Sequence, residues 1–171
     1  DLVFLDESGC NTDMTRRYAY SLGGSRSVDS APLSKPKNTT ILSSIQLDGT
    51  LRYTTFSGGT TVERFKRYLE TDLLPHLNGN SVLIMDDMKS HHAKAVRNLL
   101  DSSGVRYIYL PPYSPDLNPI EKLWSKVKSF LRKFKARTLD ALPNEIQCAF
   151  QIVSPSDCSG WFHSCGYSPY F

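Results

Sequence analysis

The sequence predicts an α/β fold in which a mixed β-sheet is flanked by helices. Two observations carry this prediction: a hairpin pattern stands early in the chain, and short apolar runs alternate with helical patterns later. A hairpin joins antiparallel strands, whereas strands separated by helices usually run parallel. The order strand, hairpin, helix, strand, helix, strand, helix therefore indicates a sheet with early antiparallel strands and later parallel strands.

Segments predicted as strands are short and rich in apolar, β-branched or aromatic residues. The first, residues 2–5, is wholly apolar, as expected for a strand buried on both faces. The dipeptide Asp48-Gly49 lies between two such runs and is a strong hairpin signal. The predicted strands are residues 2–5, 17–22, 39–47, 51–56, 82–85 and 105–110.

Segments predicted as helices carry apolar residues three or four positions apart. They are residues 60–74, 91–100, 120–134 and 139–153. In the third of these helices we expect a buried stripe made of Ile120, Leu123, Trp124, Val127, Leu131 and Phe134. Residues 25–38, which are rich in Ser, Pro and Lys, and the proline-rich residues 111–119 are predicted to be loops.

Length and composition are those of one globular domain. Of the 171 residues, 40% are hydrophobic and 22% are charged, and the formal net charge is +3. We expect residues 1–171 to form a single domain, because a chain of this length buries a sizeable core. No apolar run approaches the roughly 18 residues of a membrane span, so no membrane contact is expected. The four cysteines lack zinc-site spacing and are expected to be reduced thiols, as in a cytosolic protein.

Two aspartates stand directly after apolar strands. Asp6 follows residues 2–5, and Asp86 follows residues 82–85. Ligands of α/β sheets collect at the carboxyl ends of strands, so neighbouring strands would point both carboxylates into one crevice. Close carboxylates repel each other unless one is protonated or a cation lies between them. Oxygen ligands favour Mg²⁺ or Mn²⁺, which makes a divalent-cation site the functional interpretation.

A third acid, Glu121, stands at the start of the helix predicted over residues 120–134. Asn118 is a favourable N-cap, and Pro119 is favoured at the first helical position. Glu121 can then form a capping box with the backbone N–H of Asn118, which is the favoured interpretation when these residues are taken alone. The positive end of the helix dipole also keeps a carboxylate ionised there, which suits a metal ligand. The residues leave both interpretations open.

Basic residues follow Glu121 along the same helix. Between Lys122 and Arg137 there are seven Lys or Arg residues and no acid. They form either an ordinary solvated face or a surface that binds DNA phosphates. For the second interpretation the candidate contacts are Lys128, Arg132 and Lys135, which line up with Glu121 at helical spacing, and more weakly Arg16 and Arg17.

Three motifs together resemble the mariner superfamily of transposases, and within it the bacterial insertion-sequence branch. They are Phe4-Leu-Asp6-Glu-Ser8, Leu83-Ile-Met-Asp86 and Leu110-Pro-Pro-Tyr-Ser-Pro-Asp-Leu-Asn-Pro-Ile-Glu121-Lys-Leu-Trp124. The last motif is long and specific, and the 34 residues between Asp86 and Glu121 match a spacing found in that superfamily. Residues 161–167 also look like the closing segment of the bacterial proteins.

The resemblance implies a ribonuclease H-like fold and a DDE catalytic triad. Carried over by position, the triad is Asp6, Asp86 and Glu121. In this family such residues hold two Mg²⁺ or Mn²⁺ ions for cleaving DNA strands at transposon ends and for joining the freed 3′-OH to target DNA. The family usually has asparagine where Asp87 stands and a histidine that maps to His91. Both are therefore possible auxiliary residues, although capping or packing explains His91 equally well.

For the intact protein the resemblance implies further parts, partners and a location. Related proteins carry N-terminal helix-turn-helix domains that bind transposon ends, and they act as dimers on DNA. Residues 1–6 look like a strand already in progress, so we expect such a segment to precede this chain. A bacterial transposase is expected in the cytoplasm, associated with the nucleoid. Two alternatives stay open: another ribonuclease H-like nuclease, and a non-catalytic DNA-binding or assembly module such as a domesticated or decayed transposase.

Overall fold

A computed structural model of the chain describes residues 1–16, 18–30, 38–135 and 138–167. Its centre is a five-stranded sheet with the strand order β3-β2-β1-β4-β5. The pairs β1–β2 and β2–β3 are antiparallel, and β4 and β5 extend the sheet in parallel from β1. The predicted mixed sheet is therefore confirmed. The strands are β1 (Leu2–Asn11), β2 (Asn38–Gln46), β3 (Leu51–Ser57), β4 (Val82–Met85) and β5 (Arg106–Tyr109).

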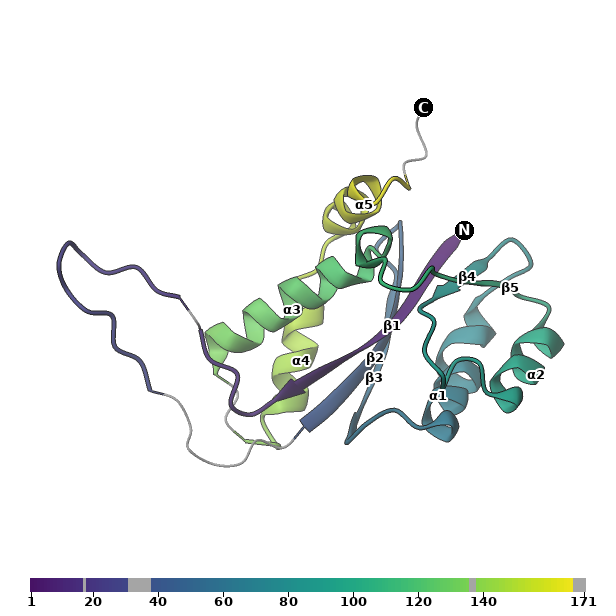
Figure 1. Cartoon of the computed structure of the whole chain (residues 1–171), viewed down its shortest axis with the longest axis horizontal. Helices are drawn as coiled ribbons and strands as arrows, with labels where there is room; N and C mark the ends of the chain where they lie inside the picture. The colour runs from purple at the N-terminus through teal and green to yellow at the C-terminus, as the bar shows by residue number, and fades with distance from the viewer. Residues whose placement is uncertain (17, 31–37, 136–137, 168–171) are drawn as a thin grey trace.

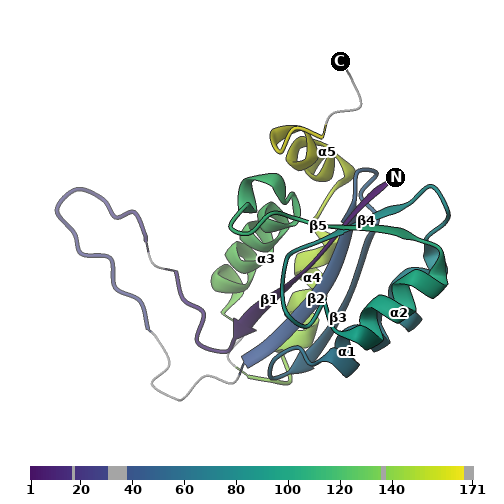
Figure 2. The same ribbon diagram turned by 45° about the vertical axis from the view of Figure 1, so that its right-hand side comes forward.

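Helices cover both faces of the sheet. Figures 1 and 2 show α3, α4 and α5 on one side of the strands and α1 and α2 on the other. Across the described residues, no helix is both long enough and apolar enough to cross a bilayer. The helical elements are α1 (Val62–Tyr68), its continuations η1 (Leu69–Leu73) and η2 (Leu74–His76), α2 (Lys94–Ser103), η3 (Pro115–Leu117), α3 (Ile120–Phe134), α4 (Leu142–Gln151) and α5 (Pro155–Ser164).

Alternation along β1 divides the core into two layers. Phe4 and Cys10 pack in the layer formed with α3, α4 and α5, whereas Val3 and Leu5 pack in the layer formed with α1, η1 and α2. Successive side chains of a strand point to opposite faces, so a strand between two helical layers needs apolar residues at every position. The prediction that residues 2–5 form a strand buried on both faces is confirmed.

The hairpin predicted at Asp48-Gly49 forms between β2 and β3. The Oδ1 atom of Asp48 accepts a hydrogen bond of 2.8 Å from the backbone N–H of Thr50, and Gly49 adopts a φ of 92°. A β-carbon at Gly49 would lie 3.0 Å from the Cα of Pro155, so neither the backbone conformation nor the space allows a side chain. The tight turn lets the hairpin pack against the start of α5.

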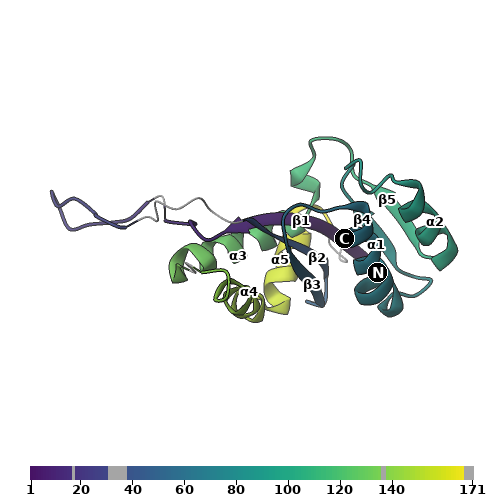
Figure 3. The same cartoon turned by 90° about the horizontal axis from the view of Figure 1, so that it is seen from below.

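The prediction of a strand at residues 17–22 is wrong for residues 18–22, which are the part that the structure describes. Residues 18–22 pair with no strand among the described residues and extend away from the sheet beside the end of α3 (Figures 1 and 3). Tyr18 and Tyr20 are almost fully exposed there. The aromatic composition suggested a strand, but the segment lies beyond the edge of the sheet. Arg17 lies outside the described residues.

Three helix predictions also need correction. Phe134 is 51% exposed because α3 ends beyond the core, and its ring stacks instead on Phe130. The helices expected over residues 91–100 and 139–153 are shifted or shorter, as α2 and α4. Helix α5 was not predicted, although Ser154 and Asp157 form a capping box with Pro155 in the first turn. That start signal was present in the sequence, but little helical apolar periodicity follows it.

Candidate active site

β1 continues past Asp6 to Asn11, so the strand that the sequence predicted over residues 2–5 is longer than expected, and Asp6 lies in its middle beside the carboxyl end of β4. The parallel register pairs Leu5 with Met85, so the next residues along the two strands are Asp6 and Asp86. Asp6 shares the face of β1 that carries Phe4, and Asp86 follows Ile84 in the same alternation. Both aspartates therefore point toward the side of the sheet that α3 covers.

Helix α3 brings the third acid to the same place. Glu121 lies in the first turn of α3 and is exposed. All three carboxylates line one hollow of about 390 Å³, whose far wall is the proline-rich segment 110–115. The charges of Asp86 and Glu121 both act on Asp6, which shows that the three side chains are electrostatic neighbours. Acids from three distant parts of the sequence thus share one hollow.

The capping box expected for Glu121 does not form. The backbone N–H of Asn118, which a capping box requires, donates instead to the carbonyl oxygen of Pro115 at 3.2 Å. The N-cap position of α3 is Pro119, and no side chain caps it. Asn118 as the capping residue is therefore wrong, because the preceding 3-10 turn η3 leads directly into α3. This leaves the carboxylate of Glu121 available to the hollow.

Asn118 has a different place in the site. Its side chain is 5% exposed and lines the hollow beside the acids. Its Oδ1 atom is buried and has no hydrogen-bond partner among the described residues. A buried carbonyl oxygen without a donor is unfavourable, so this atom is suited to a ligand that enters the hollow.

Asp6 is the most buried of the three acids, at 7% exposed. The pKa of its carboxyl group is raised from 3.8 to about 7, mainly by burial and also by the nearby charges of Asp86 and Glu121. A hydrogen bond of 2.9 Å from the indole Nε1 of Trp124 to the Oδ2 atom of Asp6 opposes this shift. Asp6 is therefore ready to bind either a proton or a cation near neutral pH.

Asp86 is held from the other layer of the protein. The fully buried His91 lies with its Nδ1 atom 2.7 Å from the Oδ1 atom of Asp86, and its ring stacks on Phe65 of α1. Burial alone would lower the pKa of His91, but the hydrogen bond and the charge of Asp86 outweigh burial and raise it. Tyr109 of β5 donates a hydrogen bond to the backbone carbonyl of His91. His91 is therefore a packed support for Asp86.

Asp87 faces away from this pairing. Its Oδ1 atom pairs with the Nε2 atom of His92, whose ring lies against Tyr109. Asp87 borders the hollow but is exposed. Of the two consecutive aspartates, Asp86 is the one that the sheet directs toward Asp6.

The chemistry of these groups fits a hard divalent cation. The hollow offers carboxylate oxygens and the unpaired amide oxygen of Asn118, which are the donors that Mg²⁺ and Mn²⁺ prefer. A cation would also offset the repulsion and burial that raise the pKa of Asp6. Within the described part of the chain, no three acidic, histidine or cysteine side chains yet lie close enough to hold an ion. A closer approach of these side chains is needed to complete such a site.

The basic side of α3 runs along β1, away from the acids. Lys128 and Arg132 border a hollow together with the end of β1 and the residues after it. Arg132 also borders a second hollow with Arg16. Three of the candidate DNA contacts, Arg16, Lys128 and Arg132, therefore lie close together on one surface.

The remaining candidate contacts have other outcomes. The Nζ atom of Lys135 pairs with the carboxylate of Asp29, so its charge is partly neutralised within the protein. Arg17 lies outside the described residues, and the structure does not place it. The basic surface next to β1 is thus smaller than the stripe expected from the sequence.

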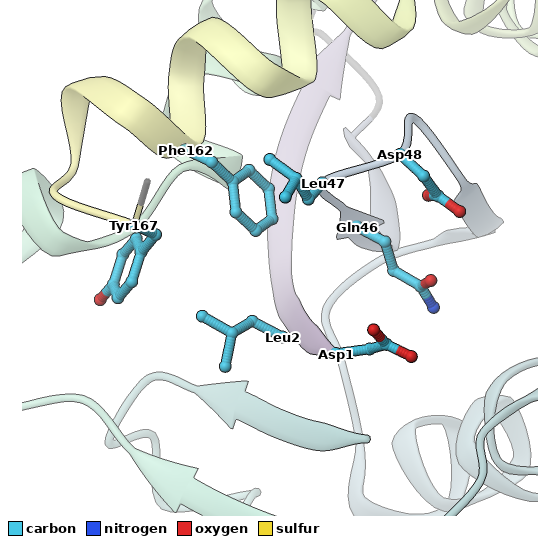
Figure 4. Close-up of a pocket in the computed structure, with 7 residues that line it drawn as sticks. All are labelled: Asp1, Leu2, Gln46, Leu47, Asp48, Phe162 and Tyr167. Carbon is cyan, nitrogen blue, oxygen red and sulfur yellow. The ribbon is translucent and has the colours of Figure 1, made fainter. Parts of the chain in front are cut away.

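A separate hollow, of about 660 Å³, lies at the amino-terminal end of β1. In Figure 4, Leu2, Phe162 and Tyr167 lie on one side of it, and Asp1, Gln46 and Asp48 lie on the other. Its lining contains none of the three acids Asp6, Asp86 and Glu121. It is separate from the candidate active site.

The residue that sequence reasoning missed is Trp124. It was expected only in the buried stripe of the helix, where its ring does lie. A buried tryptophan needs a partner for its indole N–H, and this requirement could have pointed to a nearby acceptor. The sequence did not reveal that the acceptor is Asp6, 118 residues earlier in the chain.

The chain is similar to known proteins in sequence and in fold. Residues 1–143 match the model of the family described as DDE superfamily endonuclease. The Transposable element Tc1 transposase of Caenorhabditis elegans is 28% identical over 97 residues, which cover 54% of this chain and 36% of that protein. The match thus spans about a third of this relative's length.

Two solved structures show the same fold. The Mos1 transposase paired-end complex with left transposon end superposes with a TM-score of 0.80 at 19% identity, covering 96% of this chain and 52% of that one. The Mos1 transposase catalytic domain with Raltegravir and Mg superposes with a TM-score of 0.71 at 18% identity, covering 99% of this chain and 85% of that one. The ribonuclease H-like fold expected from the motifs is confirmed.

Proposed function

The chain belongs to the DDE superfamily endonucleases, and we propose that it is the catalytic domain of a transposase that cleaves DNA and transfers the cut strand. The observation that carries this proposal is the hollow shared by Asp6, Asp86 and Glu121, which come from β1, the end of β4 and the start of α3. The match to Tc1 transposase supports transposition over other chemistry of the same family.

In this proposal the three acids hold two Mg²⁺ or Mn²⁺ ions. When bound, such ions supply charge neutralisation for the phosphate, activation of the attacking oxygen and stabilisation of the leaving oxygen. Relatives solved with Mg and with Mn support this use of divalent cations. The protein's own part is to hold the ligands: Asp6 lies between the other two acids, Asp86 is fixed by His91, and Glu121 closes the site from α3.

The DNA partner is proposed to approach along the basic side of α3. Lys128, Arg132 and Arg16 lie beside the site and are placed to contact phosphates without reading bases. Relatives solved as paired-end and strand-transfer complexes support DNA as the partner. We also propose a dimer as the working form, because the motifs of the chain resemble transposases that act as dimers. We further propose membership of the bacterial insertion-sequence branch, on the motifs of the chain, and with it a cytoplasmic, nucleoid-associated location.

The test is a cleavage and strand-transfer assay on DNA oligonucleotides with Mg²⁺ or Mn²⁺, comparing wild type with Glu121→Gln. The substitution keeps the size and helix position of Glu121 but removes its charge, so cleavage should be lost while thermal stability stays the same. Glu70→Gln, on the opposite helical layer, is the matched control. Preserved cleavage by Glu121→Gln would contradict the triad. Cleavage without strand transfer would favour a nuclease, and absence of both would favour a non-catalytic module.

A further inference from the structure

The contact between Trp124 and Asp6 links two parts of the site. Trp124 is 3% exposed, and its Nε1 atom donates a 2.9 Å hydrogen bond to the Oδ2 atom of Asp6. The ring itself packs in the layer formed by Phe4, α3, α4 and α5. Packing alone requires only an aromatic ring at this position, whereas the hydrogen bond requires an indole N–H.

Both partners of this hydrogen bond need each other. A buried indole N–H without an acceptor is unfavourable, and a buried carboxylate without a donor is more so. Among the described residues, Trp124 provides the side-chain hydrogen bond to Asp6. Because one carboxylate oxygen is held by the indole, rotation of the Asp6 side chain is restricted and its second oxygen has a fixed direction.

The same side chain also sets the position of Glu121. Trp124 and Glu121 lie on α3 three residues apart, less than one helical turn. The side chain of Glu121 has no hydrogen bond or ion pair of its own among the described residues, so the helix determines where it lies. A hydrogen bond from this turn of α3 to β1 therefore fixes the separation between the first and third acids.

We propose that Trp124 is a positioning residue of the active site: its indole N–H holds one oxygen of Asp6, directs the other oxygen toward the shared hollow, and keeps Glu121 in register with it. The catalytic consequence rests on the proposed function, but the cation-binding consequence does not. Asp86 supports the proposal by analogy, because one of its oxygens is likewise held by a ring nitrogen, that of His91.

The experiment removes the N–H while keeping the ring. In the full chain, Trp124→Phe removes the donor, and replacement of Trp124 by 3-benzothienylalanine exchanges only the N–H for sulfur. Trp161→Phe, at the chain's other tryptophan, is the control. Mn²⁺ affinity is measured by electron paramagnetic resonance of the free ion, and stability by thermal unfolding. Cleavage is assayed separately.

We expect both donor-free variants to bind Mn²⁺ about 10- to 100-fold more weakly, the usual effect of losing a group that orients a metal ligand. The benzothienyl variant should keep its melting temperature, and Trp161→Phe should keep its affinity. In NMR spectra, the indole N–H signal of Trp124 should shift on Mg²⁺ addition and in Asp6→Asn. Affinity within twofold of wild type in the benzothienyl variant would overturn the proposal, as would a wild type that binds no Mn²⁺.

The binding readout separates the two proposals. A wild type that binds Mn²⁺ through a Trp124-dependent site but cleaves no DNA would refute the proposed function and leave the role of Trp124 standing. If the wild type cleaves DNA and the donor-free variants bind Mn²⁺ as tightly as the wild type, the proposed function stands and the role of Trp124 is refuted.

Discussion

The two aspartates of the site are held in opposite ways. Asp6 lies within β1, is almost fully buried, and takes its hydrogen bond from Trp124 in the layer of α3. Asp86 lies just beyond β4, is partly exposed, and takes its hydrogen bond from His91 in the layer of α1 and α2. The site therefore stands at the seam between the two cores, and each core fixes one ligand. A substitution that disturbs one of the two cores should therefore affect catalysis through the aspartate that this core holds.

The largest expected effect separates Asp86 from Asp87. Asp86→Asn should reduce DNA cleavage by at least about 1,000-fold, since a bound ion contributes several kcal/mol of charge stabilisation. Asp87→Asn should keep cleavage within a few-fold, because Asp87 pairs with His92 instead of facing Asp6. Rates of oligonucleotide cleavage in Mn²⁺ measure both variants. Loss of cleavage in Asp87→Asn but not in Asp86→Asn would mean that Asp87, and not Asp86, is the second ligand.

The burial of Asp6 predicts that the free energy of unfolding of the metal-free protein depends on pH. Its pKa rises from 3.8 to about 7 on folding, so the folded state binds the proton more tightly. The contribution of Asp6 to stability is therefore most favourable below about pH 4 and falls as the pH rises from about 4 to 7, by at most about 4 kcal/mol. Asp6→Asn should remove this loss, raising the melting temperature at pH 8 but not at pH 4.5. Thermal unfolding at the two pH values, with chelator present, provides the measurement.

An equal effect of Asp6→Asn at both pH values would contradict this account of Asp6. Asp86→Asn provides the comparison, because Asp86 is less buried and should not show the same gain. Adding Mg²⁺ to the wild type at pH 8 should recover part of the lost stability, since the ion replaces the proton between the acids.

A smaller effect is expected at His91. His91→Phe keeps the stacking on Phe65 but removes the donor to Asp86, and should weaken Mn²⁺ binding about 10- to 100-fold. His91→Asn should restore part of the affinity, because its side-chain amide can donate in place of Nδ1. Isothermal titration with Mn²⁺ distinguishes the two variants. Equal affinity in wild type and His91→Phe would reduce His91 to a packing residue.

The smallest effect concerns the basic surface beside β1. Lys128→Ala should weaken DNA binding equally for all sequences. The slope of the logarithm of the binding constant against the logarithm of the salt concentration should become shallower by about one, as expected when one phosphate contact is lost. Lys66→Ala, which lies on α1 in the other layer, should leave the salt dependence unchanged. Binding isotherms at several salt concentrations give both slopes. An unchanged slope for Lys128→Ala would remove it from the DNA interface.

The sequence predicts the frame of this molecule better than its fine contacts. The mixed sheet, the hairpin at Asp48-Gly49 and the buried stripe of α3 up to Leu131 follow from local patterns, because turn chemistry and periodicity are local properties. The meeting of Asp6 and Asp86 follows from two apolar runs that each lead into an acid, although β1 itself continues beyond Asp6. These features need only short stretches of sequence and simple rules of sheet geometry.

What could not be predicted depends on tertiary contacts. The indole of Trp124 finds Asp6 only when α3 packs on β1, and local sequence carries no signal for that pair. The capping box at Asn118 failed because the turn η3 had already taken its N–H, which a one-helix pattern does not show. Residues 18–22 have strand-like composition, but strand formation requires a partner, and no strand of the described residues lies beside them.

The most direct measurement is a crystal structure of the chain soaked in Mn²⁺, with the ions located by anomalous scattering. The account predicts two peaks roughly 3.5–4 Å apart, bonded by oxygens of Asp6 and Asp86, with the side chain of Glu121 turned inward to reach one of them. A soaked crystal with no peak between Asp6 and Asp86, or with bound ions that no oxygen of Glu121 contacts, would contradict it.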